Sequence, residues 1–268
     1  SSWLYSVAVQ DPADFDRRPD PRLTLLYRTA RILSRRGPKK EDLRAKTAFT
    51  FACAYGTIKK GQTKRKQEFV MKKIKIILIG AGDRGTTYAE LGAQNCPEFE
   101  LVGVADPDPE RRDYIRRMFA LPAEACFSCW EEILDRPKFA DAAIIATQDR
   151  LHFAPAMRAI ELGYQLLLEK PVAPTPAECL QVADAARRRG VRVVVCHVLR
   201  FTPFFRLLKR LVEDGRVGRI INIVHVECVG NVHQSHSYVR GNWHRSEDST
   251  PMILAKSCHD LDIVQGAW

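Results

Sequence analysis

Lys170 is one residue of this chain that could take part in catalysis. It directly follows an apolar run and lies between Glu169 and Pro171. An amine at the end of a buried strand costs free energy unless it is paired or used, so we expect it to have a task. Lys170 could hydrogen-bond a substrate hydroxyl or carbonyl and help to shuttle its proton. The alternative is a surface ion pair between Glu169 and Lys170.

His259 is a second candidate, in the polar segment Lys256-Ser-Cys-His259-Asp260-Leu-Asp262. On a helix, His259 and Asp262 share a face at i, i+3. A carboxylate beside an imidazole can orient it and raise its pKa, which suits a general acid or base. We therefore interpret His259 as catalytic, with Lys256 and Asp260 as further members of the site. The alternative is a structural histidine.

A glycine-rich turn offers a site for an anion. An apolar run ends in Gly80-Ala-Gly82-Asp83-Arg84-Gly85, and a helix-like segment follows. The first glycine permits the tight turn, the second lets phosphates approach the backbone, and the third allows close packing of the helix. The N–H groups and partial positive charge of the helix N-terminus then favour the anion.

Asp106 strengthens this reading. It ends the next apolar run, 21 residues after Gly85, where a carboxylate can accept hydrogen bonds from ribose hydroxyls. The spacing predicts a dinucleotide site. A glycine-rich turn with a chance acidic residue downstream is the alternative.

Polar residues also follow a third apolar run, at 141–146. They include Thr147, Gln148 and, at the start of the next predicted helix, His152. Groups at the end of a strand could contact the nicotinamide half of a dinucleotide. Ordinary helix capping by Thr147 or Asp149 is the alternative.

Alternating apolar runs and helical stretches indicate how these groups are positioned. We predict strands at 74–79, 100–105, 141–146, 165–169 and 192–196, and a weaker one near 125–128. We predict helices at 84–95, 108–119, 130–135, 152–162 and 176–189. Continuously apolar strands between helices are typical of a parallel sheet covered on both faces. The predicted fold class is α/β, a Rossmann-type doubly wound sheet that binds ligands at the C-terminal ends of its strands.

The pattern changes after residue 200. We predict a helix at 203–212, a long alternating strand at 220–229 and a helix near 258–266. One side of that strand would carry Ile221, Ile223, His225 and Glu227. One long strand cannot form a stable open sheet, so we interpret the chain as truncated. The expected domains are a Rossmann domain at 71–197 and the start of an α+β open-sheet domain at 198–268.

Residues 1–70 read as an atypical basic leader. They hold 16 Lys and Arg against 7 Asp and Glu, whereas residues 71–268 hold 26 against 25. The net positive charge therefore gives no argument for nucleic acid as a partner of residues 71–268. We expect Met71 to be the true start, with a transit peptide or a basic tail as alternatives.

Composition excludes several other classes of protein. No apolar run approaches the roughly 18–20 residues of a membrane span, and the start lacks the pattern of a signal peptide. Eight scattered cysteines are typical of reduced thiols in a cytosol, so we expect a cytoplasmic protein. Cys126-x-x-Cys129 could be a redox or metal motif, but no second CxxC or histidine pair completes a zinc set, so we expect no metal.

Taken in order, these motifs resemble the glucose-fructose oxidoreductase / inositol dehydrogenase / rhizopine catabolism (Gfo/Idh/MocA) family. The resemblance covers residues 71–268, and Glu169-Lys170-Pro171 is its most specific element. It also rests on the glycine motif, Asp106-Pro107, Thr147 to His152, Arg200-Phe201-x-Pro203 and His259-Asp260-x-Asp262. It implies an NAD(P)-dependent dehydrogenase of a sugar, cyclitol or related polyol, which forms a homo-oligomer when full length.

The resemblance also implies cofactor roles. Asp106 favours NAD over NADP, although Arg111 and Arg112 leave NADP open. The expected cofactor contacts are Gly80, Gly82, Asp83, Arg84, Gly85, Asp106, Thr147, Gln148, His152, Glu169 and Lys170.

By the same resemblance, Lys170 is the catalytic lysine and His259 the acid or base near the reacting carbon. Many relatives carry an aspartate four residues before this histidine, where the present chain has Ala255. We therefore expect a rearranged proton relay in which Lys256 or Asp260 takes part.

The loop 231–248 is expected to line a polyol pocket, in which Trp243 would offer an apolar face to a sugar ring. The predicted substrate contacts are Arg200, Tyr238, Asn242, Trp243 and Asp262. His233-x-x-His236 in this loop could be read as metal ligands, but a polar loop explains the two histidines as well.

Two other functions would use the same residues. Some relatives are NAD-dependent glycosidases that oxidise, eliminate and reduce back without net redox change. Other relatives have lost catalysis and act as cofactor-binding regulators. Retention of Lys170 and His259 argues against a regulator, while Ala255 in place of the usual aspartate is compatible with one.

Overall fold

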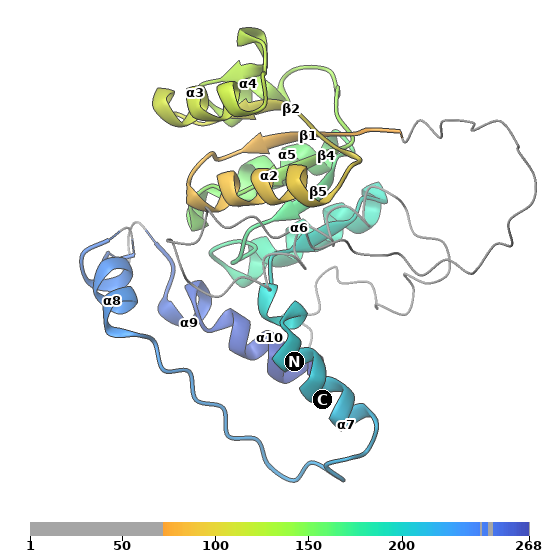
Figure 1. The fold of residues 1–268 in the computed structure, drawn as a ribbon, viewed down its shortest axis with the longest axis vertical. Coiled ribbons are helices and arrows are strands. Elements are labelled where there is room, and N and C mark those ends of the chain that lie inside the picture. Colours follow the sequence, from red (N-terminus) through yellow and green to blue (C-terminus); the bar gives the residue numbers. More distant parts are fainter. Residues whose placement is uncertain (1–71, 242, 246–248, 268) are drawn as a thin grey trace, which may run out of the picture.

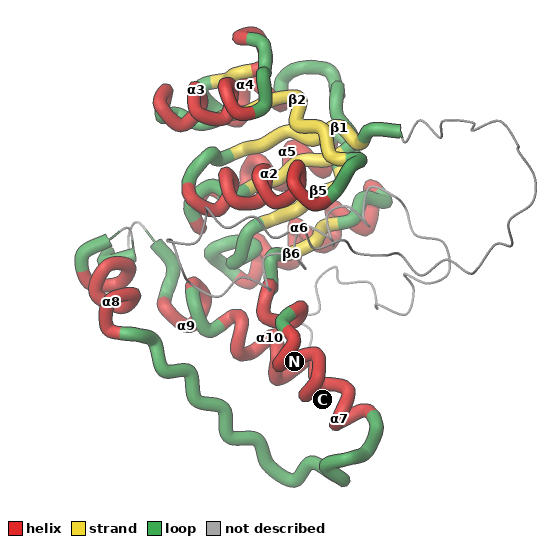
Figure 2. The backbone as a smooth tube through the Cα atoms, in the orientation of Figure 1, coloured by secondary structure: helices red, strands yellow, loops and turns green. Residues whose placement is uncertain are grey.

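A six-stranded parallel sheet organises residues 74–195. The structure is a computed structural model that describes residues 72–241, 243–245 and 249–267. The strand order is β3-β2-β1-β4-β5-β6, and neighbouring strands run parallel (Figures 1 and 2). The strands are β1 (Ile74–Ile79), β2 (Phe99–Ala105), β3 (Cys126–Phe127), β4 (Ala142–Ile145), β5 (Gln165–Leu168) and β6 (Val193–Val195). This order confirms the predicted Rossmann-type sheet.

Helices cover both faces of this sheet. They are α2 (Asp83–Asn95), α3 (Pro109–Met118), α4 (Trp130–Leu134), α5 (Phe153–Glu161) and α6 (Pro176–Arg189). Side chains alternate across β1, so Ile76 and Leu78 join the core with residues of α2 and α3. Ile77 and Ile79 join a second core with residues of α4, α5 and α6. Burial of each such side chain contributes about 1.5–3 kcal/mol, and the two cores hold the strand ends in fixed positions.

Local signals begin and end these helices. Thr175 caps α6, because its Oγ1 accepts the N–H of Glu178 at 3.2 Å while Glu178 accepts the N–H of Thr175 at 3.1 Å. Gly190 ends α6 with a φ of 69°. Asp108 caps α3 by accepting backbone N–H groups of its first turn. Every helix and strand predicted between 74 and 196 is confirmed, with bounds that agree to within one residue.

The described part of residues 198–267 is made of helices and loops. A 3-10 turn, η4 (Val198–Phe201), leads into α7 (Pro203–Glu213). A long extended segment then leads to α8 (Asn231–Gln234), η5 (Ser235–Val239), α9 (Met252–Ala255) and α10 (Cys258–Ala267). α10 packs against η4 and α7 (Figure 1). The predicted helices at 203–212 and 258–266 are confirmed.

The predicted strand at 220–229 is wrong. This segment is extended, but it pairs with no strand among the residues that the structure describes. Its side chains Ile221, Val224 and Val226 are 78%, 82% and 73% exposed. An alternating pattern shows which side chains would share a face, but a strand forms only where a second strand takes up its N–H and C=O groups.

The leader and Met71 lie outside the described residues, so the predictions for 1–70 stay predictions. Within the described ranges, no helix is long and apolar enough to cross a membrane. The cysteines that the structure describes are free thiols, Cys126 and Cys129 included.

Candidate active site

The glycine-rich loop between β1 and α2 leaves open space beside Gly82. Gly80 has a φ of 91°, and a Cβ on it would lie 2.6 Å from the carbonyl oxygen of Ala146. A Cβ on Gly85 would lie 1.9 Å from the carbonyl oxygen of Gly80. The packing of the loop therefore requires both glycines. A Cβ on Gly82 would meet a side-chain nitrogen of Arg111 at 3.8 Å and nothing nearer, so this glycine leaves room for a ligand.

The N-terminus of α2 opens onto the same loop. Gly82 is its N-cap residue, and no side chain caps the helix. Asp83 and Arg84 lie exposed in the first turn. Uncapped backbone N–H groups and the helix dipole together favour an anion at this point. The loop therefore fits the pyrophosphate of a dinucleotide, as the sequence predicts.

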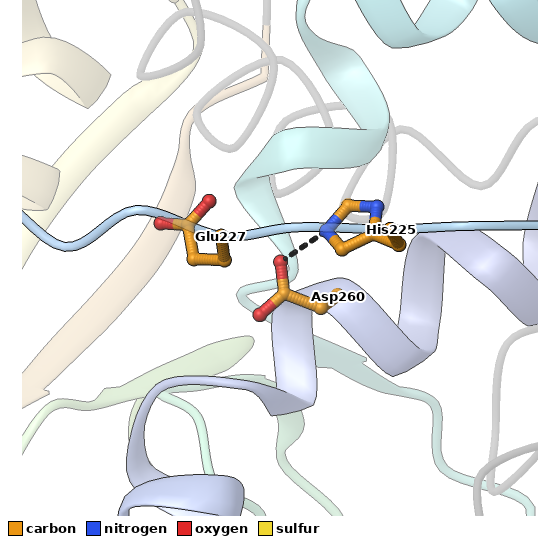
Figure 3. Close-up of side chains that lie close together, drawn as sticks. All are labelled: His225, Glu227 and Asp260. Atoms are coloured by element: carbon orange, nitrogen blue, oxygen red, sulfur yellow. Dashed lines mark hydrogen bonds and ion pairs between the residues drawn. The ribbon is translucent and has the colours of Figure 1, made fainter.

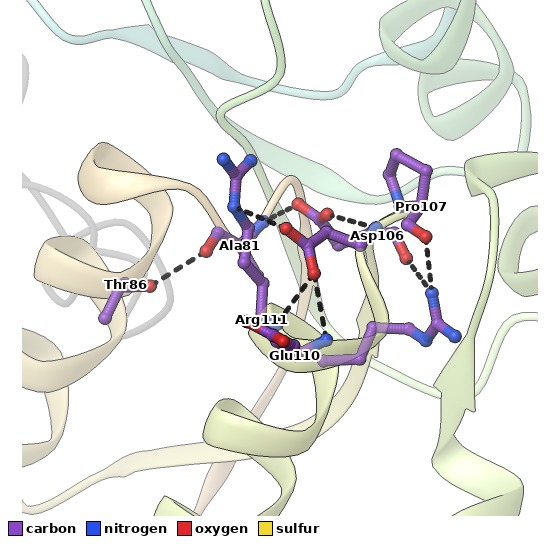
Figure 4. Close-up of polar contacts among 8 residues, drawn as sticks. Ala81, Thr86, Asp106, Pro107, Glu110 and Arg111 are labelled. Carbon is purple, nitrogen blue, oxygen red and sulfur yellow. Dashed lines mark hydrogen bonds and ion pairs between the residues drawn. The ribbon is translucent and has the colours of Figure 1, made fainter.

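Asp106 is buried at the end of β2 and braces this loop (Figure 4). Its Oδ2 accepts the backbone N–H of Ala81 at 2.7 Å, and its Oδ1 accepts that of Asp108 at 2.9 Å. Each carboxylate oxygen has a further lone pair, so the side chain could also accept a ribose hydroxyl.

Arg111 and Arg112, the two residues that leave NADP open, differ in their contacts. Arg112 donates from one side-chain nitrogen to the carbonyl oxygens of Asp106 and Pro107, at 2.6 and 3.0 Å. Arg111 forms an exposed ion pair with Asp108 at 3.3 Å and lies beside the space at Gly82. Arg112 therefore supports the end of β2, and Arg111 faces the ligand space.

The residues that follow β4 hold two loops together. His152 is buried, and its Nδ1 and Nε2 lie 2.6 Å and 3.0 Å from the carbonyl oxygens of Pro171 and Thr147. Thr147 Oγ1 donates to the carbonyl oxygen of Leu151 at 3.0 Å, and Gln148 is exposed. The buried ring of His152 thus joins the loop after β4 to the loop after β5, while Thr147 and Gln148 lie nearer the surface.

Glu169 and Lys170 point to different partners. The buried carboxylate of Glu169 accepts the Tyr88 hydroxyl and, at 2.5 Å, the backbone N–H of Lys170. Burial is the main cause that raises the pKa of Tyr88, and the charges of Cys196 and Glu169 add to it. Lys170 Nζ donates to the carbonyl oxygen of Ala255 at 2.6 Å. The alternative of a surface ion pair is therefore wrong, because Glu169 is buried and Lys170 reaches across to the end of α9.

His259 is a neutral imidazole in a positive environment. Burial is the main cause that lowers its pKa to about 3, and the charges of His197, Lys170, Lys256 and Arg84 add to it. The predicted rise of this pKa is wrong, because the loss of water and the surrounding cations both disfavour the imidazolium.

Asp262, which was expected to orient His259, pairs with Arg200 instead. Its two carboxylate oxygens accept Nε and a terminal nitrogen of Arg200 at 2.5 and 2.6 Å, and the carboxylate is buried. This bidentate pair joins η4 to α10. The predicted substrate contacts Arg200 and Asp262 are therefore occupied with each other.

Asp260 contacts the extended segment that precedes α8 (Figure 3), and Lys256 contacts the same segment. Nε2 of His225 lies 2.8 Å from Oδ1 of Asp260, and Nζ of Lys256 lies 3.0 Å from Oε1 of Glu227. The ligand atoms of His225, Glu227 and Asp260 all lie within 4.8 Å of one another, close enough for a divalent cation. Lys256 already neutralises Glu227 at this point. The pairing of these side chains was missed, although the period-two spacing of His225 and Glu227 places them on one side.

The loop after η5 contacts the Rossmann region through Asp149, which lies in the turn that follows β4. Trp243 Nε1 donates to Asp149 Oδ2 at 2.9 Å, and Thr250 Oγ1 donates to the same oxygen at 2.6 Å. Tyr238 lies beside Trp243 with ring centroids 6.3 Å apart, and burial raises its pKa to about 12. The sequence reading missed Asp149 as a docking residue, because its two partners are about a hundred residues away. Asn242 lies outside the described residues.

A family profile and several known proteins match this chain. A profile of the GFO_IDH_MocA family, described as "Oxidoreductase family, NAD-binding Rossmann fold", matches residues 74–197. Inositol 2-dehydrogenase 4 of Saccharopolyspora erythraea is 32% identical over 150 residues, which are 55% of this chain and 43% of the relative. The 2,7-anhydro-N-acetylneuraminate hydratase of Mediterraneibacter gnavus is 27% identical over 195 residues, 73% of this chain and 49% of the relative.

Solved structures show the same fold. The WlbA dehydrogenase of Bordetella pertussis, crystallised with NADH and UDP-GlcNAcA, is 25% identical with a TM-score of 0.60. The match covers 74% of this chain and 56% of the WlbA chain. The chain spans about half the length of the curated relatives it matches.

Proposed function

Since the chain belongs, through residues 74–197, to the Gfo/Idh/MocA family of NAD-binding oxidoreductases, we propose that it is a dehydrogenase of a sugar, cyclitol or related polyol. The observation that carries the proposal is that Lys170, which follows β5 at the C-terminal edge of the sheet, reaches the end of α9, close in sequence to His259. Lys170 Nζ bonds to Ala255, four residues before His259, and its charge contributes to the low pKa of His259.

NAD, when bound, supplies the acceptor for the hydride of a carbinol carbon. Gly82 and the N-terminus of α2 would hold its pyrophosphate, and Asp106 would accept its adenosine ribose hydroxyls. Glu169 and Tyr88 hold the end of β5, from which Lys170 projects.

Lys170 and His259 would manage the proton of the substrate hydroxyl. The ammonium of Lys170 can donate to the substrate oxygen and stabilise the negative charge that grows on it. His259 would accept the proton as the hydride leaves: burial keeps it unprotonated at neutral pH, while its pKa of about 3 makes it a weak base.

NADH titration is the first test. Binding would be followed by energy transfer from tryptophan to the nicotinamide, with circular dichroism to confirm folding. We expect saturable binding that Asp106→Ala weakens and the exposed variant Glu110→Ala leaves unchanged. No binding by a folded sample would refute the cofactor site.

Turnover would then be measured in a screen of sugars and cyclitols with NAD, with the wild-type chain and with Lys170→Met. We expect NADH to accumulate with wild type and to fall by at least about a hundredfold with Lys170→Met. If wild type turns over no substrate and Lys170→Met still binds NADH, the result would favour a regulator.

A redox-neutral reaction is the second candidate, and the relative named as a hydratase favours it. In this reaction the substrate is oxidised, loses a group by elimination and is reduced back, so NADH does not accumulate. Product release without net NADH would support this candidate over the dehydrogenase.

A further inference from the structure

Two imidazole nitrogens beside the candidate active site are buried without a partner. Nδ1 of His197 and Nδ1 of His259 are shielded from solvent, and neither hydrogen-bonds to a residue that the structure describes. A buried polar atom left unpaired costs about 1–3 kcal/mol. Two such atoms in neighbouring rings call for an explanation that packing alone does not give.

The two rings pack edge to face. His197 lies two residues beyond the end of β6, at the sheet edge where this fold binds its ligands. Its ring centroid lies 5.7 Å from that of His259, and the ring planes meet at 87°. Edge-to-face contact sets the angle of an aromatic ring without a hydrogen bond. Asp262 is engaged by Arg200, so the carboxylate that was expected to orient His259 is paired elsewhere, whereas the ring of His197 lies against His259.

The charges around His197 are mixed. Burial is the main cause that lowers its pKa; Asp262 and Glu169 act to raise it, and Arg200 and Lys170 act to lower it. The carboxylates come from α10 and from the end of β5, and the cations from η4 and from the same end of β5.

Several cations act on His259. After burial, the largest causes that lower its pKa are the charges of His197, Lys170, Lys256 and Arg84. At His197, by contrast, Asp262 and Glu169 partly offset the effect of burial. Protonation of one ring further disfavours protonation of the other.

We propose that His197 is a positioning residue for His259: its ring packs edge to face against the ring of His259 and holds it in the orientation in which it accepts the substrate proton. The catalytic part of this inference rests on the proposed function. The coupling between the two rings does not, so it can be tested without a substrate.

The test uses histidine NMR on the whole protein. His197→Phe keeps the ring shape and removes both nitrogens, and His197→Ala also removes the ring contact. The Cε1–H signal of His259, assigned by its loss in His259→Gln, would be followed from about pH 2.5 to about pH 8, a range that includes its pKa of about 3. We expect no titration of His259 near neutral pH in wild type. We expect its pKa to rise by about half a unit or more in His197→Phe and further in His197→Ala, which lets water reach the ring.

His236→Phe is the matched control, because His236 is exposed on η5 and makes no ring contact with His259 in the described structure. It should leave the His259 signal unchanged. An identical His259 titration in wild type and in both folded His197 variants would overturn the proposal. If His197→Phe does not fold, as judged by circular dichroism, His197→Gln takes its place with the same expectation.

Once a substrate is known, the pH profile of kcat/KM adds a kinetic readout. In His197→Phe the acid limb should move to higher pH, and kcat should fall about tenfold while KM changes less than twofold. Equal changes in kcat and KM with no shift of the limb would overturn the positioning role. If the protein shows no turnover but the pKa of His259 still changes in the His197 variants, the proposed function is refuted. The coupling between the two rings then stands.

Discussion

Residues 74–195 and residues 198–267 are held together by different forces. In the first region every strand is covered on both faces, and apolar side chains from the sheet and helices fill two closed cores. In the second region the described part buries few apolar side chains, among them Ala255, Cys258 and Ile263. Its contacts are mainly polar pairs, such as Arg200 with Asp262 and Lys256 with Glu227. The first region therefore follows from apolar periodicity, whereas the second depends on which polar groups meet.

Gly85→Ala would break the first region and should have the largest effect. A Cβ there would lie 1.9 Å from the carbonyl oxygen of Gly80, so backbone must move, and we expect a loss of about 4 kcal/mol or more in the free energy of unfolding. Urea denaturation followed by circular dichroism measures it. Gly82→Ala, where the nearest atom is 3.8 Å away, should cost less than about 1 kcal/mol yet weaken NADH binding at least tenfold. Equal stability losses in both variants would contradict the assignment of their roles.

Arg200→Met would break the second region while sparing the first. It leaves the buried carboxylate of Asp262 without its partner, and we expect a loss of about 3 kcal/mol in the stability of the contact between η4 and α10. Hydrogen exchange should show faster exchange in α10 and unchanged exchange in β1 and β4. The double variant Arg200→Met with Asp262→Leu should recover part of the loss, since it removes the unpaired charge. Equally faster hydrogen exchange in both regions would show that they unfold together.

A third prediction concerns the pH dependence of the free energy of unfolding, through His259 in the second region. His259 has a pKa of about 3 in the folded protein and an ordinary value of 6.5 when unfolded, so the unfolded chain binds the proton first. Stability should therefore fall as the pH drops from 6.5 toward 3, by at most about 1.4 kcal/mol per pH unit from this group. The difference between wild type and His259→Gln isolates the contribution, and exposed His236→Gln is the control. A constant difference across this range would contradict the low pKa.

Thr175→Ala should have the smallest effect, and a purely local one. It removes the capping box of α6, and we expect a loss of about 1 kcal/mol in the free energy of unfolding. Thr175→Ser, which keeps the hydroxyl, should lose less than half as much in the same denaturation experiment. A loss in Thr175→Ser as large as that in Thr175→Ala would place the effect in the methyl group instead of the cap.

The predictions from sequence succeeded where structure is local. The glycine spacing and the continuous apolar runs between helical stretches act over a few residues, so the helices and strands between 74 and 196 were found to within one residue. They failed at 220–229, where the alternation of Ile221 and Ile223 is that of a strand but no described strand lies beside it. They also paired Asp262 with His259, its neighbour on the helix, whereas the structure pairs it with Arg200.

The sequence by itself determined the Rossmann architecture, its glycine-rich loop and the identity of Lys170 and His259 as candidates for chemistry. These follow from short-range backbone preferences and from the burial of apolar side chains at fixed periods. The tertiary structure alone decided the partners of the polar groups: Lys170 with the carbonyl of Ala255, and His259 with the ring of His197. Such partners lie 85 and 62 residues apart along the chain, and only the folded backbone determines the distances, the burial and hence the pKa of each group.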